Sequence, residues 1–214
     1  MKKTSKNIFV VLSPPQNIED EEILVSHLLE EGLEYFHLRK PDADEQTHIN
    51  YLRQIPLRYH GNIVLHSHFH LMQSYAIRGI HFGARNISLL HEYLPYNCHK
   101  SISLHHPTEI DDAQQKNFSY AFFSPVFTSI SKNNYHPQYT ISSLNQYYTE
   151  KAFTLPLIAL GGICQTNIDQ LKDSCFSGIA IMSALWDVFQ QEGTHAAIRY
   201  FKSTQNTWQR QHTY

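Results

Sequence analysis

The chain has 214 residues, of which 42% are hydrophobic and 17% charged, a size that predicts one substantial hydrophobic core. Its 17 basic and 19 acidic side chains give a formal net charge of −2, which provides no general attraction to nucleic acid or anionic lipid. The longest apolar runs, at 8–12 and 155–160, fall far below the ~20 residues that a membrane-spanning helix needs. The N-terminus also lacks a secretory hydrophobic region, so we expect a cytoplasmic protein without a membrane span.

Cysteine and histidine usage narrows the chemistry. The three cysteines, Cys98, Cys164 and Cys175, are an odd number without a C-x-x-C pair, so we expect reduced thiols and no disulfide framework. The 15 histidines are the unusual number, and they raise two alternatives, metal ligation and acid–base chemistry near neutral pH. Composition leaves both alternatives open.

Taken in chain order, short β-branched or aromatic runs alternate with longer amphipathic stretches. Strands are predicted at residues 8–13, 35–39, 62–66, 79–82, 100–104, 120–124, 157–160 and 178–182. Helices are predicted at residues 20–31, 45–55, 69–76, 89–94, 108–115, 141–151, 166–173 and 193–203, followed by a polar tail, about 203–214, that is expected to fray. This alternation implies right-handed βαβ units, and eight of them in this length favour a single (β/α)₈ TIM-barrel domain over residues 1–214.

A barrel of this kind carries its chemistry at the carboxyl ends of its strands. Gly161 and Gly162 end the seventh predicted strand, and Met182 and Ser183 end the eighth, where a short helix is expected to begin at Ser183. Glycines let backbone N–H groups approach an anion, and a helix N-terminus directs a positive dipole at it. The glycine pair could also be only a tight turn, but its pairing with Met182–Ser183 favours a phosphate site.

The other strand ends supply polar groups. After the sixth strand, Ser129, Ser131 and Lys132 lie in a loop that could close over an anionic ligand or form a polar surface turn. The fifth strand places Ser103 and His105 on one face, and an imidazole there suits proton transfer. Arg39, at the end of the second strand, offers a guanidinium fork for phosphate or carboxylate oxygens.

With these residues in place, the sequence resembles the thiamine phosphate synthase and TenI family of (β/α)₈ barrels. The resemblance covers about residues 7–190 and rests on six motifs in the same order. They are HLRK at 37–40, GIHFG at 79–83, SISLHH at 101–106, SPVFTSISK at 124–132, IALGGI at 158–163 and GIAIMSAL at 178–185.

The resemblance implies a magnesium site in the synthase branch, built from an Asn-Asp pair after the third strand and a further Asp after the fourth. Here the corresponding residues are His66–Ser67 and Asn86, so two carboxylates are replaced by a hydroxyl and an amide. Because Mg²⁺ prefers anionic oxygen ligands, we expect no metal cofactor, with magnesium required only if the chain is a synthase.

The resemblance further implies a thiazole-phosphate cradle at Gly161, Gly162, Met182 and Ser183, with Ser129, Ser131 and Lys132 in the family's Thr-x-Thr-Lys loop. On the second strand the family's Gln-x-Arg-x-Lys is replaced, so His37 stands for the glutamine, Arg39 matches, and Lys40 comes one place early. TenI-type thiazole tautomerases also lack the carboxylates and that glutamine, and they use a histidine at the position of His105.

We therefore expect a TenI-like thiazole tautomerase, an isomerase of thiamine biosynthesis, that shifts a proton on a carboxythiazole phosphate. The alternatives are a thiamine phosphate synthase, which is a transferase, and a non-catalytic binder of thiazole or thiamine phosphates. The expected partner in each case is a phosphorylated thiazole, and a homodimer is compatible with the sequence.

A metal-dependent hydrolase is an alternative of another class. If the third strand extends to His70, alternation would direct His66, His68 and His70 to one side, where His81 and His105 could join them as zinc ligands. The remaining histidines without an assigned role are expected to be solvated; they include His48, His60, His91, His195 and His212.

Overall fold

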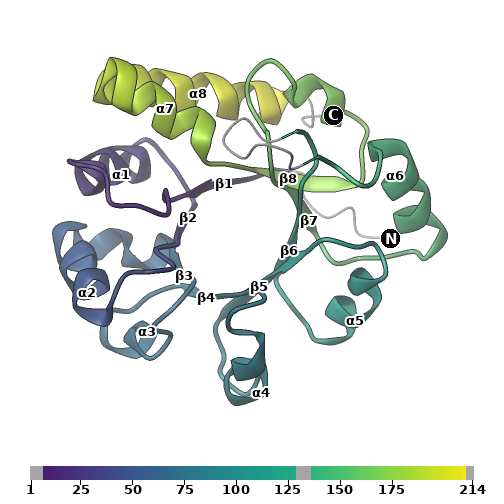
Figure 1. Cartoon of the computed structure of the whole chain (residues 1–214), viewed down its shortest axis with the longest axis horizontal. Coiled ribbons are helices and arrows are strands. Elements are labelled where there is room, and N and C mark those ends of the chain that lie inside the picture. Colours follow the sequence, from purple (N-terminus) through teal and green to yellow (C-terminus); the bar gives the residue numbers. More distant parts are fainter. Residues whose placement is uncertain (1–6, 129–135, 211–214) are drawn as a thin grey trace.

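Eight parallel strands form a closed barrel in the order of the chain, as predicted (Figure 1). The structure is a computed structural model that describes residues 7–128 and 136–210. Its strands are β1 (Ile8–Leu12), β2 (Tyr35–Leu38), β3 (Ile63–Leu65), β4 (Gly79–Phe82), β5 (His99–Leu104), β6 (Tyr120–Phe123), β7 (Leu157–Ala159) and β8 (Phe176–Ile181). Closure is completed by β8 pairing with β1, so the described barrel leaves no strand edge open.

Helices surround the ring of strands (Figure 1). The α-helices are α1 (Glu21–Glu30), α2 (Glu45–Gln54), α3 (Leu71–Ser74), α4 (Leu90–Tyr93), α5 (Glu109–Gln115), α6 (Ile141–Glu150), α7 (Ser183–Glu192) and α8 (Thr194–Arg210). Short 3₁₀ helices are η1 (Leu57–Asn62), η2 (Ile87–Leu89) and η3 (Ile168–Leu171).

Local sequence signals fix several helix ends. The Asp44 carboxylate accepts a hydrogen bond of 2.8 Å from the Thr47 N–H and caps α2. At the end of α1, Gly32 has a φ of +94°, and the N–H groups of Gly32 and Leu33 donate back to the carbonyls of Leu29 and Leu28. This is a Schellman ending, which needs the left-handed conformation that glycine adopts readily.

Two predicted helices and the predicted tail differ from the structure. The region 166–173 forms only the 3₁₀ turn η3, and the region 69–76 shortens to the four residues of α3. The prediction that the tail frays was wrong for residues 203–210, because α8 continues to Arg210; residues 211–214 lie outside the described part of the chain. Phe201, Thr204 and Trp208 are fully buried along that helix, so packing stabilises a segment whose polar composition suggested disorder.

The barrel interior divides into an apolar part and a polar part. One buried cluster inside the barrel consists of Val10, Leu12, Tyr120, Phe122, Ile158 and Ala180. Beside it lie the side chains of His37, His81 and Ser101, all at most 2% exposed. Imidazoles therefore take up part of the interior that aliphatic side chains usually fill. Among the described helices, none is both long enough and apolar enough to cross a membrane.

Candidate functional site

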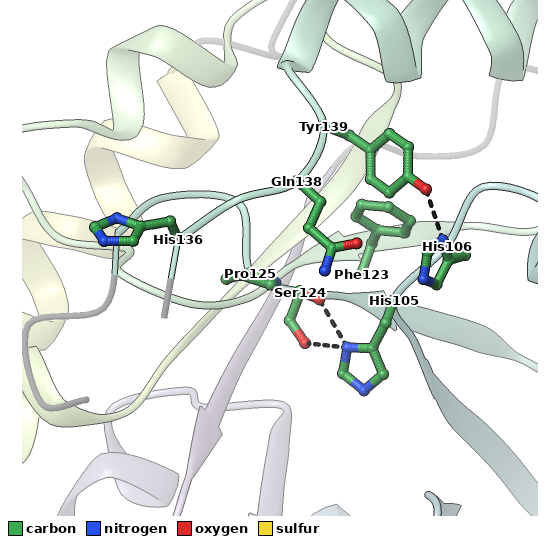
Figure 2. Close-up of a pocket in the computed structure, with 8 residues that line it drawn as sticks. All are labelled: His105, His106, Phe123, Ser124, Pro125, His136, Gln138 and Tyr139. Atoms are coloured by element: carbon green, nitrogen blue, oxygen red, sulfur yellow. Dashed lines mark hydrogen bonds between the residues drawn. The ribbon is translucent and has the colours of Figure 1, made fainter. Parts of the chain in front are cut away.

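A cavity of about 160 Å³ opens at the carboxyl ends of β5 and β6. Its walls are His105, His106, Phe123, Ser124, Pro125, His136, Gln138 and Tyr139 (Figure 2). The position agrees with the expectation that the chemistry of a barrel lies at this end of its strands. The structure thus brings the predicted base, His105, into a cavity.

His105 is exposed and held in one orientation by Ser124, the residue that follows β6. Its Nδ1 lies 2.7 Å from the carbonyl oxygen of Ser124 and 3.4 Å from the Ser124 hydroxyl. A carbonyl can only accept a hydrogen bond, so we assign the proton of the neutral imidazole to Nδ1. Nε2 is then the unprotonated nitrogen, and Figure 2 shows this second ring nitrogen directed away from Ser124.

The segment after the β6 loop completes the cavity. The hydroxyl of Tyr139 lies 2.6 Å from Nδ1 of His106, and Gln138 and Tyr139 lie across the cavity from His105 in Figure 2. Sequence reasoning missed Gln138, Tyr139 and the orienting carbonyl of Ser124. Tyr139 is 33 residues from His106, too far for motif spacing to predict their contact. Every residue has a backbone carbonyl, so the sequence could not single out that of Ser124.

The turn after β7 needs its glycines for a structural reason. Gly161 and Gly162 have φ values of +93° and +67°, and the Gly161 carbonyl accepts a 3.0 Å hydrogen bond from the Phe127 N–H. A Cβ on Gly162 would lie 2.5 Å from the Thr128 carbonyl oxygen. Both residues therefore hold the β6 and β7 loops together, while their role in phosphate binding stays a prediction.

Met182 and Ser183 lie at the start of α7, directly after β8, as expected. Met182 is the N-cap residue, and its carbonyl accepts hydrogen bonds from the N–H groups of Leu185 and Trp186. The first turn of α7 contains no acidic side chain, so nothing on that turn opposes an anion. Because β7 pairs with β8, the two predicted parts of the cradle follow neighbouring strands.

Ser103, on β5, and Arg39, directly after β2, are associated with the buried histidines of the barrel. The Ser103 hydroxyl lies 2.8 Å from Nε2 of His81. Burial is the main cause of the lowered pKa values of His66 and His81, and the positive charge of Arg39 adds to it. Neither Ser103 nor Arg39 lines the cavity at His105. Ser129, Ser131 and Lys132 lie outside the described residues, so their part in the site stays a prediction.

The residues at the family's magnesium positions do not fit a magnesium ion. The Asn86 amide is used by the backbone: its Oδ1 accepts from the Gly83 N–H at 2.7 Å, and its Nδ2 donates to the His66 carbonyl at 2.8 Å. The Ser67 hydroxyl lies 3.0 Å from Nε2 of His48. No anionic oxygen therefore replaces the family's carboxylates at these two positions.

Lys40 does not take the place of the family lysine. Its side chain is 1% exposed, and its ammonium group lies 2.5 Å from Oε2 of Glu21, which is equally buried. The Tyr51 hydroxyl donates to the other oxygen of that carboxylate at 2.8 Å. Burial lowers the pKa of Lys40 and raises that of Glu21, as expected for a pair removed from water.

Several histidine predictions were wrong. His66, His68 and His70 do not share one side, because β3 ends at Leu65 and His68 has a φ of +50°, so alternation stops before them. His66 approaches His37, whereas His68 lies against His48 and His70 lies 3.2 Å from the Glu45 carboxylate. His48 and His60 are buried rather than solvated, at 1% and 3% exposure.

The fold and the cavity together define a (β/α)₈ barrel protein with a candidate site at the carboxyl ends of its strands. The sequence profile of the TMP-TENI family, described as thiamine monophosphate synthase, matches residues 8–185. The chain therefore belongs to this family of thiamine biosynthesis.

Individual relatives agree with that assignment. The thiamine-phosphate synthase of Dictyoglomus turgidum is 24% identical over 167 residues, covering 76% of this chain and 74% of the relative. The one from Lysinibacillus sphaericus is 24% identical over 95% of this chain and 97% of its own. The crystal structure of thiamine phosphate pyrophosphorylase from Bacteroides thetaiotaomicron is 31% identical, with a TM-score of 0.80 over 92% of this chain and 95% of its own.

Proposed function

We propose that the protein is a thiazole tautomerase that moves a proton on a carboxythiazole phosphate, with His105 as the acid–base group. The observation that carries this proposal is the hydrogen bond from His105 Nδ1 to the Ser124 carbonyl, at 2.7 Å. It fixes the imidazole and leaves Nε2 to take a proton from one ring atom of the substrate and return it to another. Because the proton is only relocated, the reaction needs no cofactor.

The phosphate of the substrate would bind between the β7 turn and the first turn of α7, at Gly161, Gly162, Met182 and Ser183. Binding energy from a phosphate remote from the reacting atoms would fix the ring beside His105. Arg39, Ser103, Ser129, Ser131 and Lys132 remain proposed substrate contacts. The proposal draws support from the family membership and from the position of β7 and β8 as neighbouring strands.

Thiamine phosphate synthase activity is the second candidate, because the relatives in Dictyoglomus turgidum and Lysinibacillus sphaericus carry that name. It would join a pyrimidine pyrophosphate to thiazole phosphate and release pyrophosphate, with magnesium as the expected cofactor. The side chains of Ser67 and Asn86 disfavour the synthase activity, because both are hydrogen-bonded within the protein and neither offers a carboxylate to the metal.

The two candidates are separated by ³¹P NMR. The protein is incubated with thiazole phosphate, hydroxymethylpyrimidine pyrophosphate and Mg²⁺, and in parallel with the carboxythiazole phosphate tautomer. We expect no pyrophosphate release and a rapid conversion of the tautomer. Pyrophosphate release at an enzymatic rate would replace the proposal with the synthase. Binding of thiazole phosphate without turnover of either substrate would identify a non-catalytic binder.

A further inference from the structure

We infer that His37, His66 and His81 form a binding site for a divalent transition metal, with zinc as the best match, inside the mouth of the barrel. Each residue offers one ring nitrogen, and these three nitrogens all lie within 4.8 Å of one another. Among the described residues this is the only group of three or more potential ligands brought so close together. The inference does not depend on the proposed tautomerase activity.

Three strands build this cluster. His37 belongs to β2, His81 belongs to β4, and His66 directly follows β3, which lies between them in the sheet. The Nδ1 of His37 lies 2.9 Å from the Nε2 of His66, and the rings of His66 and His81 have centroids 4.2 Å apart. The set thus comes from neighbouring strands of a closed sheet and does not depend on a long loop for its position.

The chemistry of the cluster suits a metal of borderline softness. Imidazole binds a metal through a neutral ring nitrogen, and two of the three rings, those of His37 and His81, are buried inside the barrel at 0% and 2% exposure. Neutral nitrogen ligands favour zinc, copper or nickel and disfavour magnesium. The cluster therefore offers a nitrogen site in a member of a family whose synthase branch is expected to use an oxygen site.

Partners behind the histidines would orient them as ligands. Nε2 of His37 lies 2.5 Å from the Tyr120 hydroxyl, and Nδ1 of His81 lies 2.8 Å from the Ser101 hydroxyl. A metal-bound histidine commonly donates its other N–H to such an oxygen, which fixes the ring and the tautomer. His37 and His81 therefore have the support that a ligand needs.

Metal binding requires a rearrangement of definite kind. Tetrahedral zinc with bonds of about 2.0–2.1 Å separates its nitrogens by about 3.4 Å, so Nδ1 of His37 and Nε2 of His66, which lie 2.9 Å apart, must separate slightly. Nε2 of His81 must also exchange its 2.8 Å hydrogen bond to the Ser103 hydroxyl for the metal. His66 is the partly exposed member, at the carboxyl end of β3, and it can turn more freely than the two sealed rings.

The test uses the full-length, untagged protein, stripped with a chelator and titrated with Co²⁺ at neutral pH. Cobalt reports tetrahedral coordination through intense visible absorption, which octahedral binding to surface imidazoles does not give. We expect one equivalent of Co²⁺ to produce these bands, Zn²⁺ to displace it, and the metal to raise the melting temperature. Weak binding of several equivalents without the bands would overturn the inference.

Three variants assign the site. His66→Asn is expected to abolish the absorption, and Tyr120→Phe, which removes only a hydroxyl, is expected to weaken binding about 10–100-fold. His91→Asn is the matched control, because His91 is exposed and its Nδ1 lies 2.8 Å from the Ser88 carbonyl, away from the cluster. Circular dichroism of the metal-free variants shows that they are folded. Undiminished bands in folded His66→Asn would exclude the site.

Discussion

The two sides of the barrel mouth use histidine in opposite ways. At the β5–β6 side, His105 is exposed, lines the cavity, and is held through one nitrogen by the Ser124 carbonyl. At the β2–β4 side, His37 and His81 are at most 2% exposed and His66 is partly buried. The histidines of both sides lie in strands of the same sheet or directly after them, so their position in the fold does not explain why their exposure differs.

The difference shows that the neighbours of an imidazole decide what it can do. His105 has a carbonyl partner, which fixes the tautomer and leaves one nitrogen available to a ligand. His37 is bonded through both nitrogens, to His66 and to Tyr120, and its pKa is held well below the usual value by burial. The first arrangement suits proton transfer, and the second suits a neutral hydrogen-bonded or metal-bound set.

The largest expected effect comes from removing the exposed imidazole. His105→Ala is expected to lower turnover of the carboxythiazole phosphate by about 10²–10⁴-fold, the usual contribution of a general acid–base group. Thiazole phosphate should bind nearly as before, because the proposed phosphate cradle is on other strands. Turnover is measured by NMR and affinity by calorimetry, with His91→Ala as an exposed control. Wild-type turnover in His105→Ala would remove this histidine from the mechanism.

On the β2–β4 side, the buried Lys40 ammonium pairs with Glu21, and we expect this pair to contribute to stability rather than to catalysis. Lys40→Met is expected to lower the free energy of unfolding by about 3–5 kcal/mol, because it leaves the Glu21 carboxylate buried without its cation. Urea unfolding measures the loss. The double variant Lys40→Met/Glu21→Leu removes both charges and is expected to recover most of it. A loss below about 1 kcal/mol in the single variant would show that the pair is solvated in solution.

The pH dependence of stability tests whether the buried histidines stay neutral. The pKa of His81 is about 3 in the folded protein against about 6.5 when unfolded, so between these values the unfolded chain binds the extra proton. His81 therefore does not reduce the free energy of unfolding above about pH 6.5. Below that pH the free energy of unfolding falls by about 1.4 kcal/mol per pH unit. Burial, the largest cause of the shift, disfavours the charged ring.

Unfolding in urea at pH 7 and pH 5 gives the measurement. His81→Gln is expected to lose about 2 kcal/mol less than the wild-type protein across this interval, since it lacks one proton-binding group. His195→Gln, at an exposed position of α8, should retain the wild-type slope. Equal slopes for His81→Gln and wild type would show that His81 titrates alike in both states.

The sequence predicted the barrel well because strand and helix periodicity repeats along the chain, and each predicted strand is present. It failed where tertiary contacts decide the outcome. The buried Trp208 side chain stabilises the polar end of α8 by packing. His48 is buried with its Nε2 3.0 Å from the hydroxyl of Ser67, a contact between segments that are distant in the sequence. The same limit applies to the site: His105 was identifiable from its strand end, whereas Ser124 and Tyr139 depend on contacts between distant segments.

The smallest expected effect comes from Gly162, in the turn after β7 that packs on the β6 loop. Gly162→Ala places a Cβ at a φ of +67° and 2.5 Å from the Thr128 carbonyl oxygen, so the turn or the β6 loop must shift. A left-handed alanine costs about 1–2 kcal/mol, which corresponds to a roughly 5–30-fold weaker affinity for thiazole phosphate if the cradle requires this turn.

Gly61→Ala is the control for Gly162→Ala, because nothing lies within 4 Å of the added Cβ and the φ of Gly61 is not positive. Calorimetry with thiazole phosphate, combined with urea unfolding, separates the two roles of Gly162. A loss of stability with unchanged affinity would mean that this glycine serves only the packing of the β6 loop on the β7 turn. A loss of affinity beyond the loss of stability would place the phosphate against the turn itself.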